Sequence, residues 1–134
     1  MKFIVVDYSG YYYSIVAKRP VPGILRGKFV LIRKGATEYL VLSPREFTPY
    51  HADIVERFCN EKGIEGTYEK GKKRYDIDDP AWVIAGGGKF EIDRVKRSVR
   101  FYDDSMAYGK FEGGGLREQV SRNPVFKGYT LGSE

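Results

Sequence analysis

The 134 residues carry a net charge of +5 at pH 7 and mix charged, apolar and aromatic side chains, so we expect one globular domain, residues 1–134, with anionic partners. A single cysteine excludes an internal disulfide, and no Cys/His cluster of the kind that binds structural zinc is present. No apolar run is long enough to span a bilayer and the N-terminus lacks a signal-peptide pattern, which favours a cytoplasmic protein.

The N-terminal segment consists of two apolar and aromatic runs around Ser9-Gly10. Residues 1–7 and 11–17 are rich in β-branched and tyrosine side chains, which predicts a β-hairpin with its tyrosines on the sheet surface. Residues 5–10 could instead be a nucleotide-binding strand and turn, but no helical pattern follows and no glycine fingerprint is complete. We therefore expect a hairpin, followed by a loop over residues 18–27, which hold two prolines and two glycines.

A pair of strands leads into a helix in the next part of the chain. Residues 28–33 and 38–43 are apolar and β-branched on either side of a short turn, which predicts a hairpin whose first strand is central in the sheet. A helix is expected to begin with Thr48 as its N-cap and Pro49 in its first position, and to end at Gly63. Its apolar face is expected to contain Tyr50, Ile54, Val55, Phe58 and Cys59.

The only histidine of the chain, His51, lies in the first turn of this helix. It precedes Val55 by four residues and Phe58 by seven, so we expect it on the apolar face, at the rim of the core. The positive end of the helix dipole attracts anions and disfavours imidazolium, which would leave the ring neutral and basic, as a general base requires. Asp53 faces away from the ring and is read as a dipole-complementing acid. The alternative is a rim histidine without a chemical role.

The second half of the chain is richer in glycine and in turns. Gly86-Gly87-Gly88-Lys89 lets backbone N–H groups approach an anion but lacks the spacing of a P-loop. The loop Ser105-Met106-Ala107-Tyr108-Gly109 can form either a small anion nest or an ordinary turn. The remaining predictions are a hairpin within 64–85, strands at 89–93 and 98–102, a glycine hinge at 113–115, a helix at 116–121 that Pro124 ends, and a last strand at 125–130.

Four of these pieces, taken in order, resemble one family, the Janus/Ocnus phosphohistidine phosphatases. They are the strand at 28–33, Tyr50-His51-Ala52-Asp53-Ile54, Gly86-Gly87-Gly88-Lys89 and Ser105-Met106-Ala107-Tyr108-Gly109. The spacing from the triple glycine to the serine loop matches without a gap, and the resemblance spans about residues 28–109. It implies an α/β fold with a mixed six-stranded sheet flanked by two helices, to which residues 1–17 would add a hairpin.

The resemblance also implies an activity, the hydrolysis of phosphohistidine and of phospholysine in phosphorylated proteins, without a metal or other cofactor. His51 would be the catalytic residue that accepts a proton from the attacking water. Lys28 would contact the phosphate, and Ser105, Met106 and Ala107 would bind it through the serine hydroxyl and backbone N–H groups. Lys89 stands where the family commonly has an arginine. A lysine keeps the positive charge but cannot form the bidentate hydrogen bonds that a guanidinium makes with phosphate. Arg45 takes no role from the resemblance, because the loop around it differs in length.

Two other functions stay open beside a phosphatase. One is a phosphoprotein-binding or phosphate-binding module without catalysis, which Lys89 in place of arginine permits. The other is an RNA-binding domain that uses basic charge and surface tyrosines. The sequence has no RNP-like aromatic strand motif and no GxxG helix turn, which disfavours nucleic acid as the partner. For the phosphatase, His51 can act as a general base or as a transient phospho-acceptor, and no oligomeric state is predicted.

Overall fold

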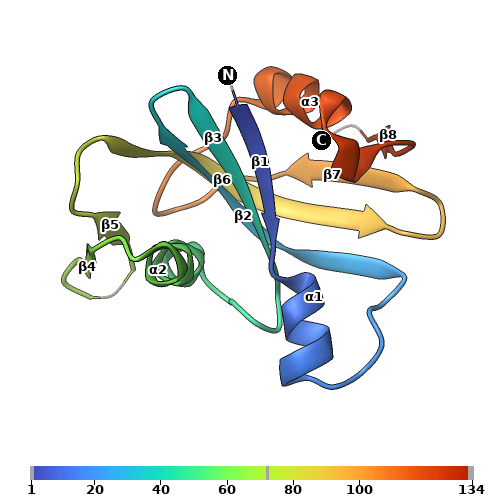
Figure 1. The fold of residues 1–134 in the computed structure, drawn as a ribbon, viewed down its shortest axis with the longest axis horizontal. Helices are drawn as coiled ribbons and strands as arrows, with labels where there is room; N and C mark the ends of the chain where they lie inside the picture. The colour runs from blue at the N-terminus through green and yellow to red at the C-terminus, as the bar shows by residue number, and fades with distance from the viewer. Residues whose placement is uncertain (1, 72, 133–134) are drawn as a thin grey trace.

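Six strands form one curled, mixed sheet in the order β1-β3-β2-β6-β7-β8 (Figure 1). The computed structural model describes residues 2–71 and 73–132. The strands of this sheet are β1 (Lys2–Asp7), β2 (Ile24–Lys34), β3 (Thr37–Pro44), β6 (Trp82–Asp93), β7 (Ser98–Tyr102) and β8 (Thr130–Leu131). The other elements are α1 (Ser9–Tyr11), η1 (Tyr12–Val16), α2 (His51–Lys62), α3 (Gly113–Arg122), η2 (Pro124–Phe126) and a small sheet of β4 (Gly66–Tyr68) and β5 (Tyr75–Ile77). The predicted α/β class, with about six strands, is confirmed.

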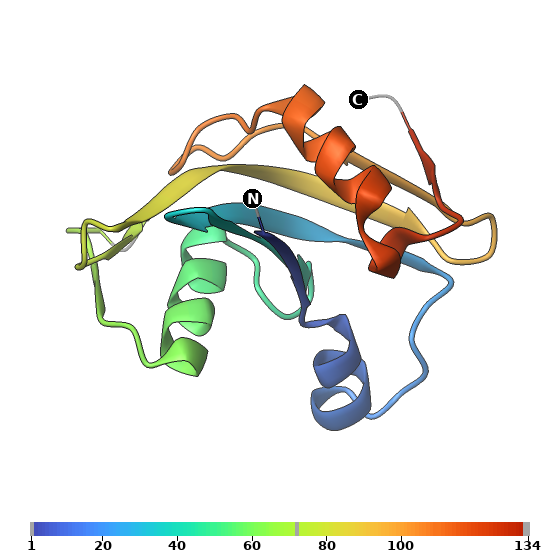
Figure 2. The same ribbon diagram turned by 45° about the horizontal axis from the view of Figure 1, so that its top comes forward.

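The two faces of the sheet carry separate cores. Helix α2 covers one face and helix α3 the other (Figure 2). Because side chains alternate along a strand, β2 supplies both cores. Its Val30 and Ile32 pack with α2, whereas Phe29 and Leu31 belong to the core that includes Leu116 of α3. The predicted central position of β2 is confirmed, since β2 pairs with β3 on one side and with β6 on the other.

The predicted N-terminal hairpin is wrong. Strand β1 exists, but it pairs in parallel with β3, and residues 9–16 are helical. Ser9 N donates to the Asp7 carboxylate at the start of this segment. Tyr13, expected on a sheet surface, is 3% exposed, and its hydroxyl donates to Glu46 over 3.0 Å. Burial against a distant part of the chain therefore outweighs the β-propensity of the tyrosine run. A helical segment does follow residues 5–10, contrary to the expectation.

The start of α2 also differs from the prediction. The helix begins at His51, after Tyr50 in an extended conformation, and no side chain caps it. Thr48 instead buries its side chain and shares a hydrogen bond with the Ser43 hydroxyl. Pro49 lies before the helix, and Tyr50 is 67% exposed rather than part of the apolar face. The predicted end at Gly63 is confirmed, because this glycine adopts the left-handed conformation with φ of 70°.

The triple glycine lies inside β6 rather than in a loop before a strand. This strand starts at Trp82 and passes through the glycines to Asp93. A side chain at Gly87 would place its Cβ 2.6 Å from the Phe29 carbonyl oxygen, and one at Gly88 would lie 2.5 Å from that of Tyr102. The glycines therefore permit close contact between strands. The predicted β4–β5 hairpin and the turn between β6 and β7 are confirmed.

The C-terminal region corrects two further expectations, whereas the predicted end of the helix before Pro124 is confirmed, because α3 ends at Arg122. Gly113 begins α3, so the second glycine run forms the first helical turn instead of a hinge. The Glu112 carboxylate caps this turn by accepting hydrogen bonds from the N–H groups of Gly114 and Gly115. Pro124 starts a short 3-10 helix, and the final strand is limited to β8. Among the described residues, no helix has the length and apolar character needed to cross a membrane.

Candidate functional site

Strands β2 and β6 place two lysines side by side. Lys28 and Lys89 are direct partners across the antiparallel pair, on the face of the sheet that carries α2 but beyond the core. Lys28 Nζ donates to the carbonyl oxygen of Pro49 over 2.6 Å, and it lies 5.6 Å from the centre of the Tyr50 ring. Lys28 thereby contacts the segment that leads into α2, and two cations stand next to the beginning of that helix.

The charges around these lysines act on one another. Burial lowers the pKa of Lys28, and the positive charges of Lys89 and Arg45 lower it further. Arg45 is therefore close enough to contribute to the positive potential, although the family resemblance implies no role for it. Lys89 Nζ lies 3.0 Å from the Asp103 carboxylate, whose pKa is lowered mainly by this hydrogen bond. Like Arg45, Asp103 lies next to these lysines although it is not in any of the motifs that predict the site.

His51 extends from the first turn of α2 onto β6. Its Nε2 lies 2.9 Å from the carbonyl oxygen of Gly88. Since a carbonyl oxygen only accepts hydrogen bonds, Nε2 carries the proton, and in the neutral ring Nδ1 has a free lone pair. No other hydrogen bond of this ring is found among the described residues. The ring is 8% exposed, and burial is the main reason that its pKa is lowered. A lowered pKa favours the neutral ring that the sequence predicts.

The serine loop, residues 105–109, is anchored to the same stretch of β6. Ser105 and Gly109 exchange two backbone hydrogen bonds of 3.2 and 2.7 Å, and the Gly109 carbonyl oxygen also accepts from Gly87 N over 3.2 Å. A Cβ added at Gly87 would lie 3.1 Å from His51 Cδ2 and 3.4 Å from Ser105 Cβ. His51 and Ser105 therefore both lie against Gly87. The Ser105 hydroxyl accepts a hydrogen bond from Tyr108 N over 3.1 Å.

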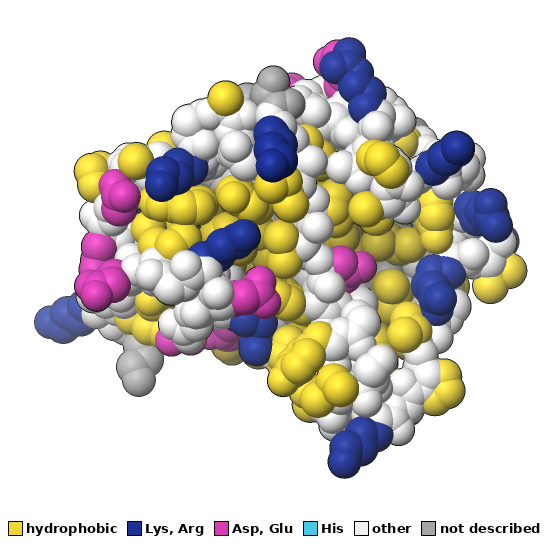
Figure 3. Space-filling view, in the orientation of Figure 1, with side chains coloured by type: hydrophobic (Ala, Val, Ile, Leu, Met, Phe, Trp, Pro, Cys, Tyr) yellow, Lys and Arg dark blue, Asp and Glu magenta, His cyan; other side chains and the backbone are white. Residues whose placement is uncertain are grey.

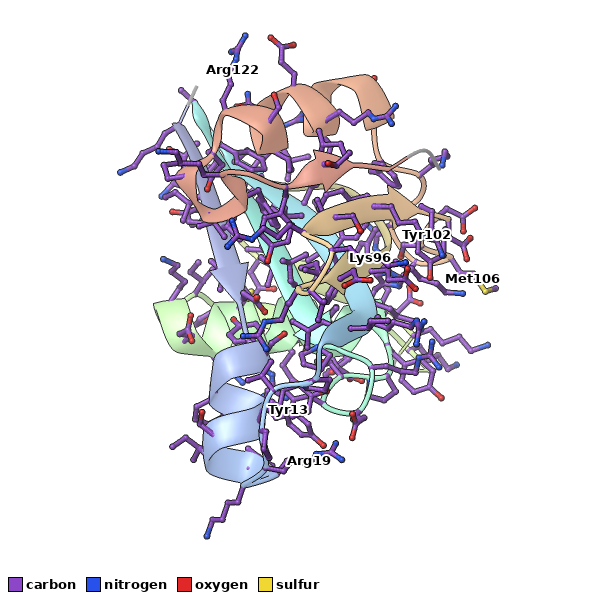
Figure 4. The ribbon with its side chains drawn as sticks, turned by 90° about the vertical axis from the view of Figure 1, so that its right-hand side faces the viewer. Tyr13, Arg19, Lys96, Tyr102, Met106 and Arg122 are labelled. Atoms are coloured by element: carbon purple, nitrogen blue, oxygen red, sulfur yellow. The ribbon has the colours of Figure 1, made fainter. Side chains whose placement is uncertain are left out.

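Two backbone donors of this loop are unused within the described part of the chain. The N–H groups of Met106 and Ala107 donate to no atom of residues 2–71 and 73–132. Arg74 anchors the loop, because its guanidinium donates a hydrogen bond to the carbonyl oxygen of Ala107. The Met106 side chain is fully exposed and points away from the sheet, on the same side of the molecule as Tyr102 (Figure 4). Successive free N–H groups on a fixed turn suit an anion.

Taken together, the predicted residues fall into one region of the structure. His51 and Ser105 both lie against Gly87, and Lys28 and Lys89 are paired further along the strands β2 and β6. A neutral imidazole, two ammonium groups and free N–H donors can bind a tetrahedral oxyanion and accept a proton beside it. Within the described residues, no group of three or more His, Cys, Asp or Glu side chains is placed to hold a metal ion.

No protein-family model matches this sequence, and no curated protein matches it either. The function of the chain must therefore be inferred from the site itself.

One prediction concerns stability in acid. Because the pKa of His51 is lower in the folded chain than its usual value near 6.5, the unfolded chain binds more protons, and stability is lost as pH falls below that value. Histidine titrates between about pH 7.5 and pH 5. Over this range we expect the free energy of unfolding of the parent protein to fall more steeply than that of His51→Gln. Urea titrations of both proteins measure the difference, and parallel losses would contradict it.

Proposed function

We propose that this chain is a metal-independent phosphatase that hydrolyses phosphohistidine, and also phospholysine, in phosphorylated proteins. The observation that carries the proposal is the position of His51, whose Nε2 donates to the Gly88 carbonyl oxygen while its ring, like Ser105, lies against Gly87. This arrangement leaves Nδ1 unpaired as the proposed base, and Lys28 is close enough for its charge to lower the pKa of the ring. The pieces that resemble the Janus/Ocnus phosphatases thus have complementary roles at a single phosphate.

The proposed reaction uses these groups in a defined way. A water oxygen bonds to phosphorus as its proton passes to His51 Nδ1, and the P–N bond breaks with its electron pair going to the substrate nitrogen. The leaving nitrogen takes a proton from solvent water, and His51 later releases to solvent the proton it accepted. Lys28, Lys89 and the N–H groups of Met106 and Ala107 would hold the phosphoryl oxygens. Phosphoryl transfer depends mostly on such positioning and charge neutralisation, so one base can suffice.

A direct experiment compares two substrates in the presence of a chelator. The parent protein is incubated with a phosphohistidine peptide and with the matching phosphoserine peptide, and released phosphate is measured. We expect release from phosphohistidine only, because a phosphoserine leaving group is a poor one without acid catalysis or a metal. Release that requires added metal, or release from neither substrate by a folded protein, would contradict the phosphatase.

A phosphoprotein-binding module is the second candidate, and one observation favours it. The ion pair between Lys89 and Asp103 partly neutralises one of the two cations of the site. Binding of the phosphohistidine peptide without release of phosphate would support this module. Binding of single-stranded RNA that weakens steeply with salt, with no response to either peptide, would instead indicate a nucleic-acid partner.

The contribution of Lys89 can be tested by substitution. We expect Lys89→Met to lower kcat/KM for phosphohistidine by roughly ten- to a hundredfold, the range for losing one charge-assisted hydrogen bond. Lys89→Arg should keep the activity or raise it, because a guanidinium can hold two phosphate oxygens. Lys96→Met is the matched control, since Lys96 is exposed in the turn between β6 and β7. Equal rates for Lys89→Met and the control would remove Lys89 from the site.

A further inference from the structure

A second concave region lies away from this site, between α2 and the N-terminal helical segment. It is a cleft of about 680 Å³, a size typical of ligand sites. Figure 3 shows the surface hollowed between these two parts of the molecule, with acidic side chains visible there. The lining residues that matter here are Tyr8, Tyr11, Phe47, Glu56, Arg57 and Glu61. Neither His51 nor the serine loop lines this cleft.

Buried polar atoms without a partner are concentrated here. In the described part of the chain there are three such side-chain atoms, and they are Tyr8 OH, Ser9 Oγ and Arg57 Nε. Tyr8 and Arg57 line the cleft, and Ser9 follows Tyr8. Tyr8 is 5% exposed, and burial raises the pKa of its hydroxyl, which therefore stays a donor. Such groups normally have partners, because leaving them unpaired costs free energy. The unpaired Tyr8 O–H and Arg57 Nε–H therefore lie beneath the wall of the cleft, where a small movement of either side chain would bring it to an acceptor oxygen.

Arg57 is held in an unusual way for a residue surrounded by acids. Its guanidinium lies 3.7 Å from the centre of the Phe47 ring and 5.9 Å from that of Tyr8. It forms no ion pair with any acid of the described residues, although Asp53 and Glu61 are one helical turn away. Ring stacking thus holds the guanidinium in place, and its buried Nε–H has no partner among the described residues.

The charge of the lining selects among possible ligands. Three carboxylates, those of Asp53, Glu56 and Glu61, face one guanidinium, so the cleft is negative within a chain of net charge +5. The Tyr68 hydroxyl lies 2.9 Å from the Glu56 carboxylate and 3.1 Å from that of Asp53, so these two acids share its single proton, and Glu61 has no such donor among the described residues. A simple anion would be repelled here. The cleft therefore suits a ligand that combines acceptor oxygens with a positive charge.

We propose that this cleft binds a basic peptide segment of a partner protein. A lysine or arginine side chain of that segment would lie between Glu56 and Glu61. The aliphatic stem of that side chain would pack on Tyr11 and Phe47. Peptide carbonyl oxygens would accept hydrogen bonds from Tyr8 and Arg57 after a small movement of these side chains, whose unpaired donors are buried beside the cleft. This surface differs from the proposed phosphate site in both position and charge, and it does not depend on that site being catalytic.

The test uses three capped peptides, Ac-Ala-Ala-Xaa-Ala-Ala-NH2 with arginine, citrulline or glutamate at Xaa, titrated into the full chain labelled with ¹⁵N. Citrulline keeps the shape of arginine but removes its charge. We expect the arginine peptide to shift the amide signals of Tyr8, Phe47 and Arg57 saturably, and the citrulline peptide to bind at least about tenfold more weakly. Equal binding of these two peptides, preferred binding of the glutamate peptide, or no saturable shift below roughly 10 mM would overturn the proposal.

Two variants separate binding from folding. Tyr8→Phe removes a hydroxyl that has no partner within the described chain, so its melting temperature should be unchanged or higher, while the arginine peptide binds roughly tenfold more weakly. Glu61→Gln should also weaken that peptide, and Glu118→Gln, which changes an exposed acid on α3, should not. Unchanged affinity in both Tyr8→Phe and Glu61→Gln would remove the cleft as the binding site.

Discussion

Replacing His51 with glutamine is expected to reduce phosphohistidine hydrolysis by at least about a hundredfold, the contribution typical of a positioned general base. Glutamine is the informative substitution, because its side-chain N–H can still donate to the Gly88 carbonyl oxygen that now accepts from His51 Nε2. It offers no basic nitrogen in place of Nδ1. The fold and the binding of phosphate should therefore survive while turnover is lost.

Steady-state rates of phosphate release by the parent and by His51→Gln measure this effect. For the parent, kcat/KM should fall as pH drops through the pKa of His51, which lies below the usual value near 6.5. The control is the melting temperature of the variant together with its affinity for inorganic phosphate. A variant that keeps more than about a tenth of the activity would remove His51 as the base. An acid-labile phosphate trapped on His51 of the parent would instead favour the phospho-acceptor role.

Gly88→Ala is expected to destabilise the protein by about 3 kcal/mol or more, the largest effect on folding that we predict for a single methyl group. Its Cβ would lie 2.5 Å from the Tyr102 carbonyl oxygen and 3.1 Å from ring atoms of both Phe29 and Phe111. The nearest of these atoms is backbone, so relief requires a shift of the strands β6 and β7. The fully buried Phe29 would have to move as well.

Urea unfolding of Gly88→Ala and of a matched glycine variant tests this expectation. Gly10→Ala is the control, because a Cβ at Gly10 meets nothing within 4 Å and the residue is helical. It should be neutral or stabilising by about 0.5–1 kcal/mol. Similar stabilities for the two variants would mean that the glycines of β6 are not needed for close strand contact.

The elements that could be predicted from the sequence are those with local signals. A short turn connects the strands predicted at 28–33 and 38–43. Gly63 ends α2 in the left-handed conformation, which glycine adopts easily. The apolar spacing of Ile54, Val55 and Phe58 gives the buried face of α2 directly. These features depend on residues close together in the chain, so pattern and structure agree.

The elements that were missed depend on distant contacts. The tyrosines at 11–13 have strand propensity, but Tyr13 is buried and bonded to Glu46, which lies far along the chain. Thr48 has the chemistry of a helix cap, yet its hydroxyl pairs with Ser43. The glycines at 86–88 look like a loop, whereas their small size serves contact between neighbouring strands. No local pattern distinguishes these outcomes.

In the candidate site, too, residues within motifs are predictable from the sequence, whereas neighbours from distant parts of the chain are not. The motifs predict Lys89, His51, Lys28 and Ser105 as site residues, and in the structure the last three lie along Gly87, Gly88 and Lys89 of β6. Arg45 and Asp103 influence the charge of that region, but their proximity to Lys28 and Lys89 follows from how the strands and loops assemble. The cleft beside Arg57 likewise requires the packing of α2 against the N-terminal segment, which the sequence placed in a hairpin.

We propose that His51, the two lysines and the serine loop act on one phosphate. This can be measured by titrating the ¹⁵N-labelled chain with inorganic phosphate, because Met106 and Ala107 have N–H groups that are unused within the described chain. We predict saturable shifts of these two amide signals and of the His51 ring, all with the same apparent Kd. Shifts confined to other surfaces, or different Kd values for His51 and the loop, would contradict a single site.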